Sequence, residues 1–399
     1  MKDLAKRVDL LRESPTRKID SIREKLKREN RDIIVFSAGQ PSIPPPIEIR
    51  ELMGQLLKVE SMELYGYTPS QGIYELRQAI SEDLKRLASI DVDPDSIVVT
   101  AGGQAAMFST LATLIEPGDE VILFDPTYFG YKPLLDYYGA KIVRHYVSME
   151  NEFQPDIEKL KSQITSKTKA IIIVTPDNPS GRLITHESAK ALAEIAVDHD
   201  IWLITDEAYK TLIYEGEHEY LYKYAPNNVI SLNTFSKDPA IPGWRLGYAY
   251  GPKEVISKIK LVNEEMVYCP PSFAQHMVAR YLRSEVRMSY IKRVVEEYRR
   301  RRDIMVSEIR SKLPGAKFVI PKGSMFVFTD FKEYGLNGDY LSNLLLEKYG
   351  VASVPGSYFS EVYTSALRFS FVAETPERIK KGIEKVSEAL EDLGKNHTK

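Results

Sequence analysis

The stretch VISLNTFSKDPAIPGWRLGYAY, residues 229–250, decides the fold. It begins with an apolar run over 229–233, which is typical of a strand buried on both faces of a sheet. That run ends in TFSK, residues 234–237, and a second apolar run follows over 246–250. Open α/β sheets place their ligands at strand ends, so the polar residues after 229–233 are candidates for a functional site.

Apolar runs of the same kind recur through the middle of the chain. They predict strands over 96–100, 121–124, 141–143, 170–175, 202–205, 229–233 and 246–250. Amphipathic stretches such as 186–199 separate these runs and predict helices. Alternation of this kind is typical of an α/β fold with a mostly parallel sheet that is covered by helices.

The pattern changes after about residue 271. A charged amphipathic stretch over 272–312 predicts helix, followed by short strands over 317–319, 325–328, 352–355 and 367–371 and a last helix over 376–393. An N-terminal segment has its own helix (18–27) and strand (33–37), which we expect to pack on this second unit or on another subunit. We therefore expect a large domain over 47–285 and a smaller α+β domain formed by 1–46 with 286–399.

Composition argues against several classes of protein. The 399 residues hold 54 basic and 56 acidic side chains, so the formal net charge is −2 and nucleic acid is not expected as a partner. The arginine run 299–302 is expected on a solvated helix face with glutamate partners. The single cysteine, Cys269, excludes an intramolecular disulfide, and no metal site is expected. No apolar run is long enough for a membrane span and the start does not resemble a secretory signal, so a cytoplasmic location is expected.

Two strand ends carry groups that could hold an anion or a ligand. Gly102, Gly103 and Gln104 follow the strand over 96–100 and precede a helical run. Backbone N–H groups at such a turn can face an anion, although a plain glycine turn is the alternative. Asn178 follows another apolar strand, where it could also serve only as a turn residue.

The other strand ends add an acid, a phenol, an amine and a guanidinium. Asp206 and Tyr209 follow one strand, although an acid there can also cap a helix. Lys237 closes the next strand, and Arg245 lies downstream. Burial would lower the pKa of such a lysine and suit it to Schiff-base chemistry, while a surface lysine is the alternative. Together these groups match a pyridoxal phosphate site, which needs a Schiff-base lysine, an acid for the ring nitrogen and a phosphate pocket.

Nine short motifs lie in order along most of the chain. They are SAGQP (37–41), GYTPSQG with ELR (66–77), TAGGQAA (100–106), DPTYFGY (125–131), TPDNPSG (175–181), TDEAY (205–209), TFSKDPAIPGWRLGY (234–248), VPGSYF (354–359) and ALRFSF (366–371). In this order and spacing they resemble the class I aminotransferases of pyridoxal phosphate (PLP) fold type I. The resemblance implies a large PLP-binding α/β domain with a mostly parallel sheet and a smaller α+β domain.

The resemblance also assigns cofactor contacts residue by residue. Lys237 would bind PLP covalently and later move the proton at the substrate Cα. Asp206 would pair with the ring nitrogen and keep it protonated. Tyr209 and Asn178 would hydrogen-bond the 3′ oxygen, and Tyr128 would stack on the ring. The phosphate would lie among Gly102, Gly103, Gln104, Thr234, Ser236 and Arg245.

Substrate and partner contacts follow from the same resemblance. Arg368 would grip the substrate α-carboxylate through a planar fork, with Gly39 and Asn178 beside it. Tyr67 would reach the phosphate of the neighbouring subunit, which implies a homodimer with shared active sites. Gln104 stands where the family often has Ser, Thr or Lys, so this sequence departs from the pattern at that phosphate contact.

The favoured function is ping-pong exchange of an amino group between an L-amino acid and a 2-oxo acid. Aspartate or an aromatic amino acid is favoured as donor and 2-oxoglutarate as acceptor. A PLP-dependent carbon–sulfur β-lyase on the same scaffold is the alternative, because both reactions need the same lysine, acid and arginine. A regulator fused to a DNA-binding module is not expected, since the segment before Ser37 is short. If the chain were only an α/β binding protein, the positions of the lysine and the acid at the strand ends would be a coincidence.

Overall fold

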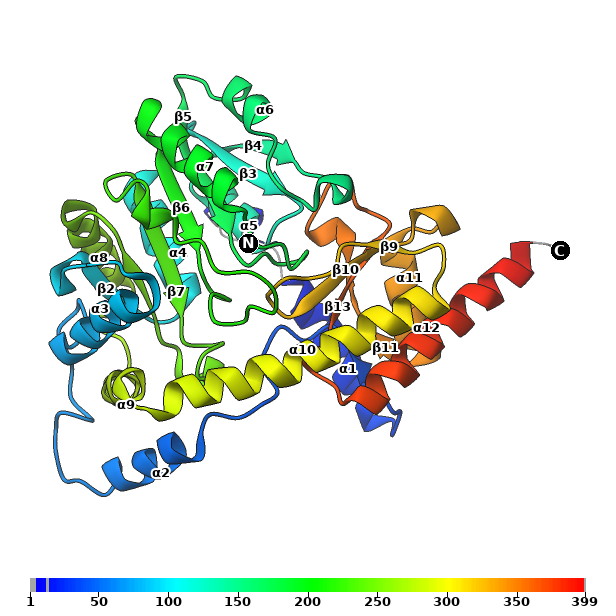
Figure 1. Cartoon of the computed structure of the whole chain (residues 1–399), viewed down its shortest axis with the longest axis horizontal. Helices are drawn as coiled ribbons and strands as arrows, with labels where there is room; N and C mark the ends of the chain where they lie inside the picture. Colours follow the sequence, from blue (N-terminus) through cyan, green and yellow to red (C-terminus); the bar gives the residue numbers. More distant parts are fainter. Residues whose placement is uncertain (1–4, 12–13, 398–399) are drawn as a thin grey trace.

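The computed structural model describes residues 5–11 and 14–397. Its main element is a seven-stranded sheet (Figure 1), whose strands alternate with helices along the chain. In spatial order the strands are β2 (Ile97–Thr100), β8 (Gly247–Tyr250), β7 (Val229–Thr234), β6 (Trp202–Asp206), β5 (Thr168–Val174), β3 (Glu120–Asp125) and β4 (Lys141–Tyr146). Strand β8 runs antiparallel to both of its neighbours, β2 and β7, and the other neighbouring strands pair in parallel. The predicted mostly parallel α/β sheet is thus confirmed.

Helices cover both faces of this sheet. They are α3 (Tyr74–Ala88), α4 (Gly103–Leu114), α5 (Tyr131–Tyr137), α6 (Ile157–Ser162), α7 (His186–Asp198), α8 (Lys253–Val267) and α9 (Ser272–Arg283). Alternate residues of β5 face opposite cores: Ile172 packs in the core that includes α4, α5 and α8, and Ile173 packs in the core that includes α7. This explains why the strand reads as an unbroken apolar run, since both of its faces are buried.

A second unit is built on a smaller sheet. Its strands lie in the order β12 (Val354–Pro355), β13 (Ala366–Ser370), β10 (Phe326–Asp330) and β9 (Lys317–Phe318), all antiparallel. A separate pair joins β1 (Ile34–Val35) in parallel to β11 (Val351–Ala352). The remaining helices are α1 (Pro15–Arg28), α10 (Val286–Lys312), α11 (Gly338–Leu344) and α12 (Pro376–His397), whereas α2 (Ile47–Leu56) packs against α9 of the large unit. The N-terminal segment packs on this unit through the pairing of β1 with β11, as expected. The domain limits at 47–285 stay a prediction.

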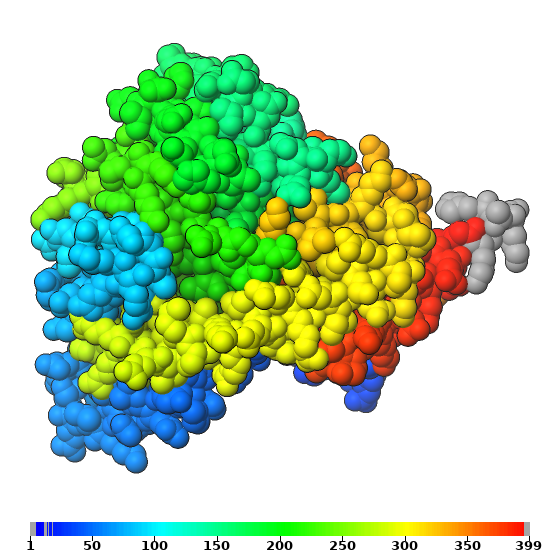
Figure 2. Space-filling view, viewed as in Figure 1, coloured from blue at the N-terminus to red at the C-terminus, as the bar shows by residue number. Residues whose placement is uncertain are grey.

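The amphipathic stretch over 272–312 forms two helices rather than one. Helix α9 ends at Arg283 and α10 begins at Val286, with Ser284 in extended backbone between them. Helix α10 then runs as a long ridge from the large unit to the small one (Figures 1 and 2). None of the helices in the described ranges is long and apolar enough to cross a membrane.

The expected solvated face of the arginine run 299–302 is wrong for Arg302 and also for Arg301, whose side chain is 14% exposed and donates to the Val372 carbonyl at 2.7 Å. Arg302 is 4% exposed and donates to Glu215 Oε1 (2.6 Å) and to the Pro321 carbonyl (2.8 Å). It lies on the helix face that also carries the buried Tyr298 and Met305, since residues spaced by three and four share a face. Arg300 and Arg301 do pair with Glu297, as expected.

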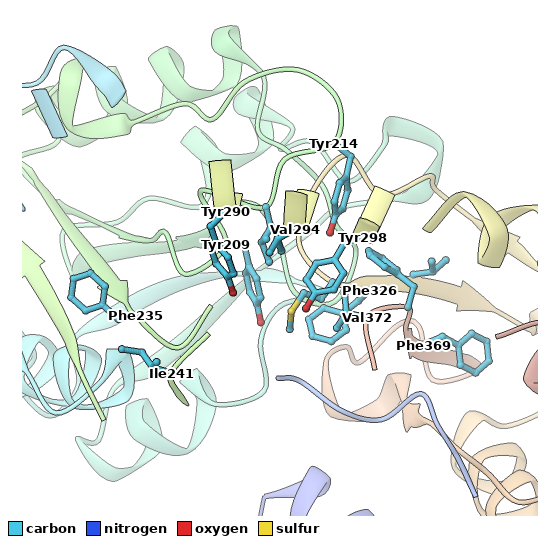
Figure 3. Close-up of a cluster of buried hydrophobic side chains, with 14 of the residues drawn as sticks. Tyr209, Tyr214, Phe235, Ile241, Tyr290, Val294, Tyr298, Phe326, Phe369 and Val372 are labelled. Carbon is cyan, nitrogen blue, oxygen red and sulfur yellow. The ribbon is translucent and has the colours of Figure 1, made fainter. Parts of the chain in front are cut away.

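A shared apolar core joins the two units. Figure 3 shows Tyr290, Val294 and Tyr298 of α10 among side chains from both units, with Tyr209 near Phe326 of β10. The ring centroids of Tyr209 and Phe326 are 6.0 Å apart at nearly right angles. This core fixes the carboxyl ends of the large sheet against the small sheet.

Candidate active site

A cavity of about 480 Å³ lies where the strand ends of the large sheet meet the small unit. Twelve of the sequence-predicted site residues line it: Gly39, Gly103, Gln104, Tyr128, Asn178, Asp206, Tyr209, Thr234, Ser236, Lys237, Arg245 and Arg368. Gly102 is outside this lining, but it precedes Gly103 in the chain and adjoins Arg245, and both of those residues line the cavity. Tyr67 is not part of it, since that side chain is 85% exposed and packs edge-on against Tyr268 with ring centroids 4.9 Å apart.

Lys237 presents its amine to the cavity from the turn that follows β7. The Nζ atom donates to the Gly39 carbonyl at 2.6 Å and lies 5.6 Å from the centroid of the Tyr209 ring. Burial, and then the charge of Arg368, lower the pKa of Lys237 to about 8, while Asp206 opposes this shift. A substantial fraction of this lysine is therefore neutral near physiological pH, which is the form that attacks a carbonyl carbon.

The residue after Lys237 anchors this turn to the helices behind it. Asp238 accepts from Arg287 Nη2 at 3.0 Å and from the Tyr281 hydroxyl. Arg287 is only 2% exposed and also pairs with Asp83. Because Tyr281 lies on α9 and Arg287 on α10, this ionic network holds the lysine turn against both helices.

Asp206 lies at the carboxyl end of β6 and receives two hydrogen bonds. The Tyr131 hydroxyl donates to Oδ2 at 2.8 Å, and the Ala208 amide donates to Oδ1 at 3.0 Å. Burial raises the pKa of Asp206, while these two donors and Lys237 favour the ionised form. The result is an oriented carboxylate in the cavity, which suits a protonated ring nitrogen.

The first turn of α4 and the loop after β7 form a cradle for an anion. Gly102 has φ +92°, and a Cβ built on it would lie 2.5 Å from Arg245 Nη2, so a side chain there would collide with the guanidinium. The Thr234 hydroxyl donates to Ser236 Oγ at 2.8 Å on the other side. The Arg245 guanidinium donates to the carbonyls of Pro242 (2.8 Å) and Ala101 (3.4 Å), which uses two of its five N–H groups. The donor set fits a phosphate group.

Arg368 is a buried cation at the middle of β13. It is 1% exposed, and it donates to Asn178 Oδ1 at 2.9 Å and to the Ser37 carbonyl at 3.0 Å. Its guanidinium carbon lies 4.0 Å from the centroid of the Phe326 ring, and its Nε has no hydrogen-bond partner. Burial lowers the pKa of Arg368 to about 10. No carboxylate pairs with it in the described part of the chain, so the geometry suits an anionic ligand that supplies the missing charge.

Several residues that line the cavity were not singled out from the sequence. Tyr131 belongs to the DPTYFGY motif, in which only Tyr128 was assigned a role. Both tyrosines line the cavity, and their ring centroids are 5.3 Å apart. Tyr128 precedes α5, in the turn where the Tyr131 amide donates to the Tyr128 carbonyl at 3.3 Å, so their closeness within one motif was the available signal. The N-terminal helix α1 adds Thr16, Asp20 and Arg23.

We expect Tyr131→Phe to slow amino-group transfer by about tenfold, which corresponds to about 1.5 kcal/mol for a hydrogen bond to a charged acceptor. The variant leaves the Asp206 carboxylate with only the Ala208 amide as donor. The pH profile of kcat should shift as well, since Tyr131 acts through Asp206. Tyr138→Phe is the matched control, because its hydroxyl donates to the Phe108 carbonyl at 3.2 Å outside the cavity. Equal effects of the two variants would contradict this role of Tyr131.

Comparison with known proteins gives the family. Residues 31–386 match the model of the aminotransferase class I and II family. The chain belongs to that family. This aminotransferase is 33% identical over 391 residues to an aspartate/prephenate aminotransferase of Thermus thermophilus, covering 98% of this chain and 99% of the relative. It is 30% identical over 393 residues to aromatic-amino-acid aminotransferase 2 of Thermococcus litoralis, covering 98% of each.

Solved structures agree with the fold. The aspartate aminotransferase from Thermus thermophilus with maleate superposes with a TM-score of 0.92 at 33% identity, covering 97% of this chain and 100% of that one. The predicted type I fold of this aminotransferase is thus confirmed. The names of these relatives favour amino-group transfer over the carbon–sulfur lyase alternative.

Proposed function

We propose that this aminotransferase uses PLP, held by the residues that line the cavity, to exchange an amino group between an amino acid and a 2-oxo acid. The observation that carries the proposal is that two cationic side chains from different sheets line the same cavity. Lys237 comes from the large sheet and Arg368 from the small one, and both have backbone or amide oxygens as hydrogen-bond acceptors. A carbonyl-bearing cofactor and a carboxylate-bearing substrate would satisfy them.

The cofactor would be held at both of its polar ends. Arg245, Thr234, Ser236 and the start of α4 would bind its phosphate, and Asp206 would face its ring nitrogen. Tyr128 lines the cavity and would lie against the ring. When bound, PLP supplies an electron sink that makes the substrate Cα proton acidic. Asp206, Thr234, Ser236 and Arg245 are already oriented by hydrogen bonds, so little reordering of these residues would be needed.

The residues themselves would handle binding and proton transfer. Arg368 would bind the substrate α-carboxylate, because its remaining donors, Nε among them, need an anion. Lys237 would then take the proton from the substrate Cα and return it one atom away, as a general base and acid with a pKa near the working pH. Asn178 would keep Arg368 in place through its 2.9 Å hydrogen bond.

The substrates are proposed from the chemistry of the relatives. The similar proteins are named for aspartate, prephenate or aromatic amino acids. We propose aspartate or an aromatic amino acid as donor and 2-oxoglutarate as acceptor. All of these carry an α-carboxylate next to the reacting carbon, which is the group that Arg368 is placed to bind.

A homodimer with shared sites is also part of the proposal. Large apolar side chains are exposed near Tyr67, namely Met62 at 75%, Tyr65 at 59% and Tyr268 at 58%. Folded monomers seldom leave such a patch in water, which supports burial against a second copy. Tyr67 would then reach the partner's phosphate cradle. A monomer in sedimentation analysis of the PLP-loaded protein would contradict this.

The experiment is a single-turnover spectrum of the PLP-loaded protein. Without any oxo acid, one amino acid at a time is added from a panel that contains aspartate, glutamate, tyrosine, phenylalanine and alanine. We expect the visible cofactor band to give way to a band at shorter wavelength with the true donor, and 2-oxoglutarate to restore it. Continuous release of pyruvate and ammonia would instead support the lyase, and absence of any band with PLP would overturn the cofactor assignment.

A further inference from the structure

One face of helix α10 holds both partners of the hydrogen bond that orients Lys237. In that bond the Nζ atom donates to the Gly39 carbonyl at 2.6 Å. Lys237 belongs to the turn after β7, and Gly39 belongs to the segment after β1, so their distance depends on what fixes these two segments. Side chains of α10 contact both segments, and their spacing puts them on one side of the helix. They are Arg287, Tyr290, Tyr298 and Arg301.

The first contacts of this face are with the two residues that follow the lysine. Arg287 Nη2 donates to Asp238 Oδ2 at 3.0 Å. The side chain of Arg287 is 2% exposed and that of Asp238 is 12% exposed, so water screens this ion pair poorly. The Tyr290 hydroxyl lies 3.4 Å from the carbonyl oxygen of the next residue, Pro239. Helix α10 thus fixes the lysine turn at two consecutive positions.

The second set of contacts is with the segment after β1. The same Tyr290 hydroxyl lies 3.4 Å from the Ile43 carbonyl oxygen. The Tyr298 hydroxyl accepts from the backbone amides of Ser42 (3.0 Å) and Ile43 (3.3 Å), and Arg301 Nη1 donates to Ser42 Oγ at 3.0 Å. Both tyrosines are buried in the core that the two units share (Figure 3). This segment is therefore fixed to the same rigid helix as the lysine turn.

We propose that Arg287 and Tyr290 are positioning residues, which hold the Lys237 amine where it can move the substrate proton. The inference rests on the proposed amino-group transfer, and neither side chain lines the cavity. Arg287 acts through Asp238, and Tyr290 acts through the two backbone carbonyls within its reach. A lysine side chain is a flexible four-carbon stem, so its amine is only as well placed as the turn and the acceptor that hold it. A displacement of about 1 Å can lower a rate by about a hundredfold.

The test uses Asp238→Asn and Tyr290→Phe, which keep the size of each side chain. In the PLP-loaded protein we expect kcat and kcat/KM to fall together, by about tenfold for Asp238→Asn and about threefold for Tyr290→Phe, whose contacts are longer. The difference in rate between donors with hydrogen and with deuterium at Cα should grow, because proton transfer becomes the slow step. A readout without turnover is the rate at which the cofactor-free protein captures PLP, which should fall by similar factors.

Glu215→Gln is the matched control. It removes the carboxylate that accepts from Arg302 at 2.6 Å, and Arg302 is a buried arginine of the same helix whose other hydrogen bonds go to Asp303 and the Pro321 carbonyl. This variant should keep kcat, the deuterium effect and the PLP capture rate within about twofold, even if its midpoint of thermal unfolding falls.

Two results would overturn the inference. One is an unchanged capture rate and deuterium effect in both Asp238→Asn and Tyr290→Phe. The other is an equal change in Glu215→Gln, since the effect would then come from general loosening of α10. Failure of the proposed function is distinguishable from both: the native protein would transfer no amino group from any donor, and the capture rates would still decide whether α10 positions the lysine.

Discussion

Replacing Lys237 with alanine is expected to lower the rate of amino-group transfer by on the order of 10⁴ to 10⁶, the range seen when a residue that forms a covalent link and also moves the proton is removed. Both tasks depend on the one amine in this cavity that burial has brought to a pKa of about 8. The measurement is a single-turnover rate with the best donor, together with the visible spectrum. Loss of the lysine-bound cofactor band should accompany the loss of rate.

Removing the Lys237 amine should leave the protein folded, and Lys237→Met, which keeps most of the volume of the side chain, tests this. The pKa of Lys237 falls from 10.5 to about 8 on folding, so the unfolded chain binds the proton more strongly. The stability penalty of about 3 kcal/mol is fully present below pH 8 and disappears as the pH rises toward 10.5. Lys237→Met should therefore not lower the midpoint of thermal unfolding of the cofactor-free protein at neutral pH. A large drop would show that the amine stabilises the fold instead.

The pH dependence of cofactor capture follows from the same pKa. Only the neutral amine attacks the aldehyde, so the rate at which the cofactor-free protein binds PLP should rise with pH and level off above about 8. Arg368→Leu removes a charge that lowers the pKa of Lys237, so its profile should shift to higher pH. Rapid-mixing absorbance between about pH 6 and pH 10 measures both profiles. Identical profiles would mean that Arg368 does not act on the lysine.

Much of the large sheet could be predicted because its strands are buried on both faces. The run AIIIV in β5 contains no polar residue, so its composition alone predicts a strand that is buried on both faces. Strand ends then converge because parallel strands share an edge, and this brings Asp206 and Lys237 together. The seven strands differ from their expected limits only by a few residues.

Other features depend on packing that a sequence does not display. No glycine or proline marks the break between α9 and α10, where the chain turns at Ser284. Arg302 resembles its charged neighbours and is buried only because Glu215 and Pro321 come from elsewhere in the chain. The contribution of α1 to the cavity could not be predicted for the same reason. Only the packing of Ile19 and Leu26 in the apolar core shows which face of that helix lines the cavity.

Asp206→Asn is expected to lower kcat by about 10² to 10⁴. A carboxylate in contact raises the pKa of a protonated cofactor ring nitrogen by about one to three, and that proton must stay bound through the whole reaction. An amide keeps the size of the side chain and cannot stabilise a protonated ring nitrogen. The Tyr131 hydroxyl and the Ala208 amide both donate to the carboxylate, so at least one donor would face the amide nitrogen of asparagine. The kcat of the best donor reaction, measured with saturating PLP, tests this.

Two controls separate charge from structure in that experiment. Asp206→Glu keeps the charge and moves it by one methylene, so it should retain more activity than the asparagine variant. Asp125→Asn changes another fully buried carboxylate at the end of β3, where Asp125 pairs with Arg144 at 3.1 Å outside the cavity lining. That variant should lose stability, because it removes the charge that pairs with the buried side of Arg144 and leaves that arginine with Glu361 (2.7 Å) as its remaining carboxylate, and it should keep kcat within about threefold. If Asp125→Asn lost as much kcat as Asp206→Asn, the effect would come from disruption of the strand ends, and the charge of Asp206 would have no special part in catalysis.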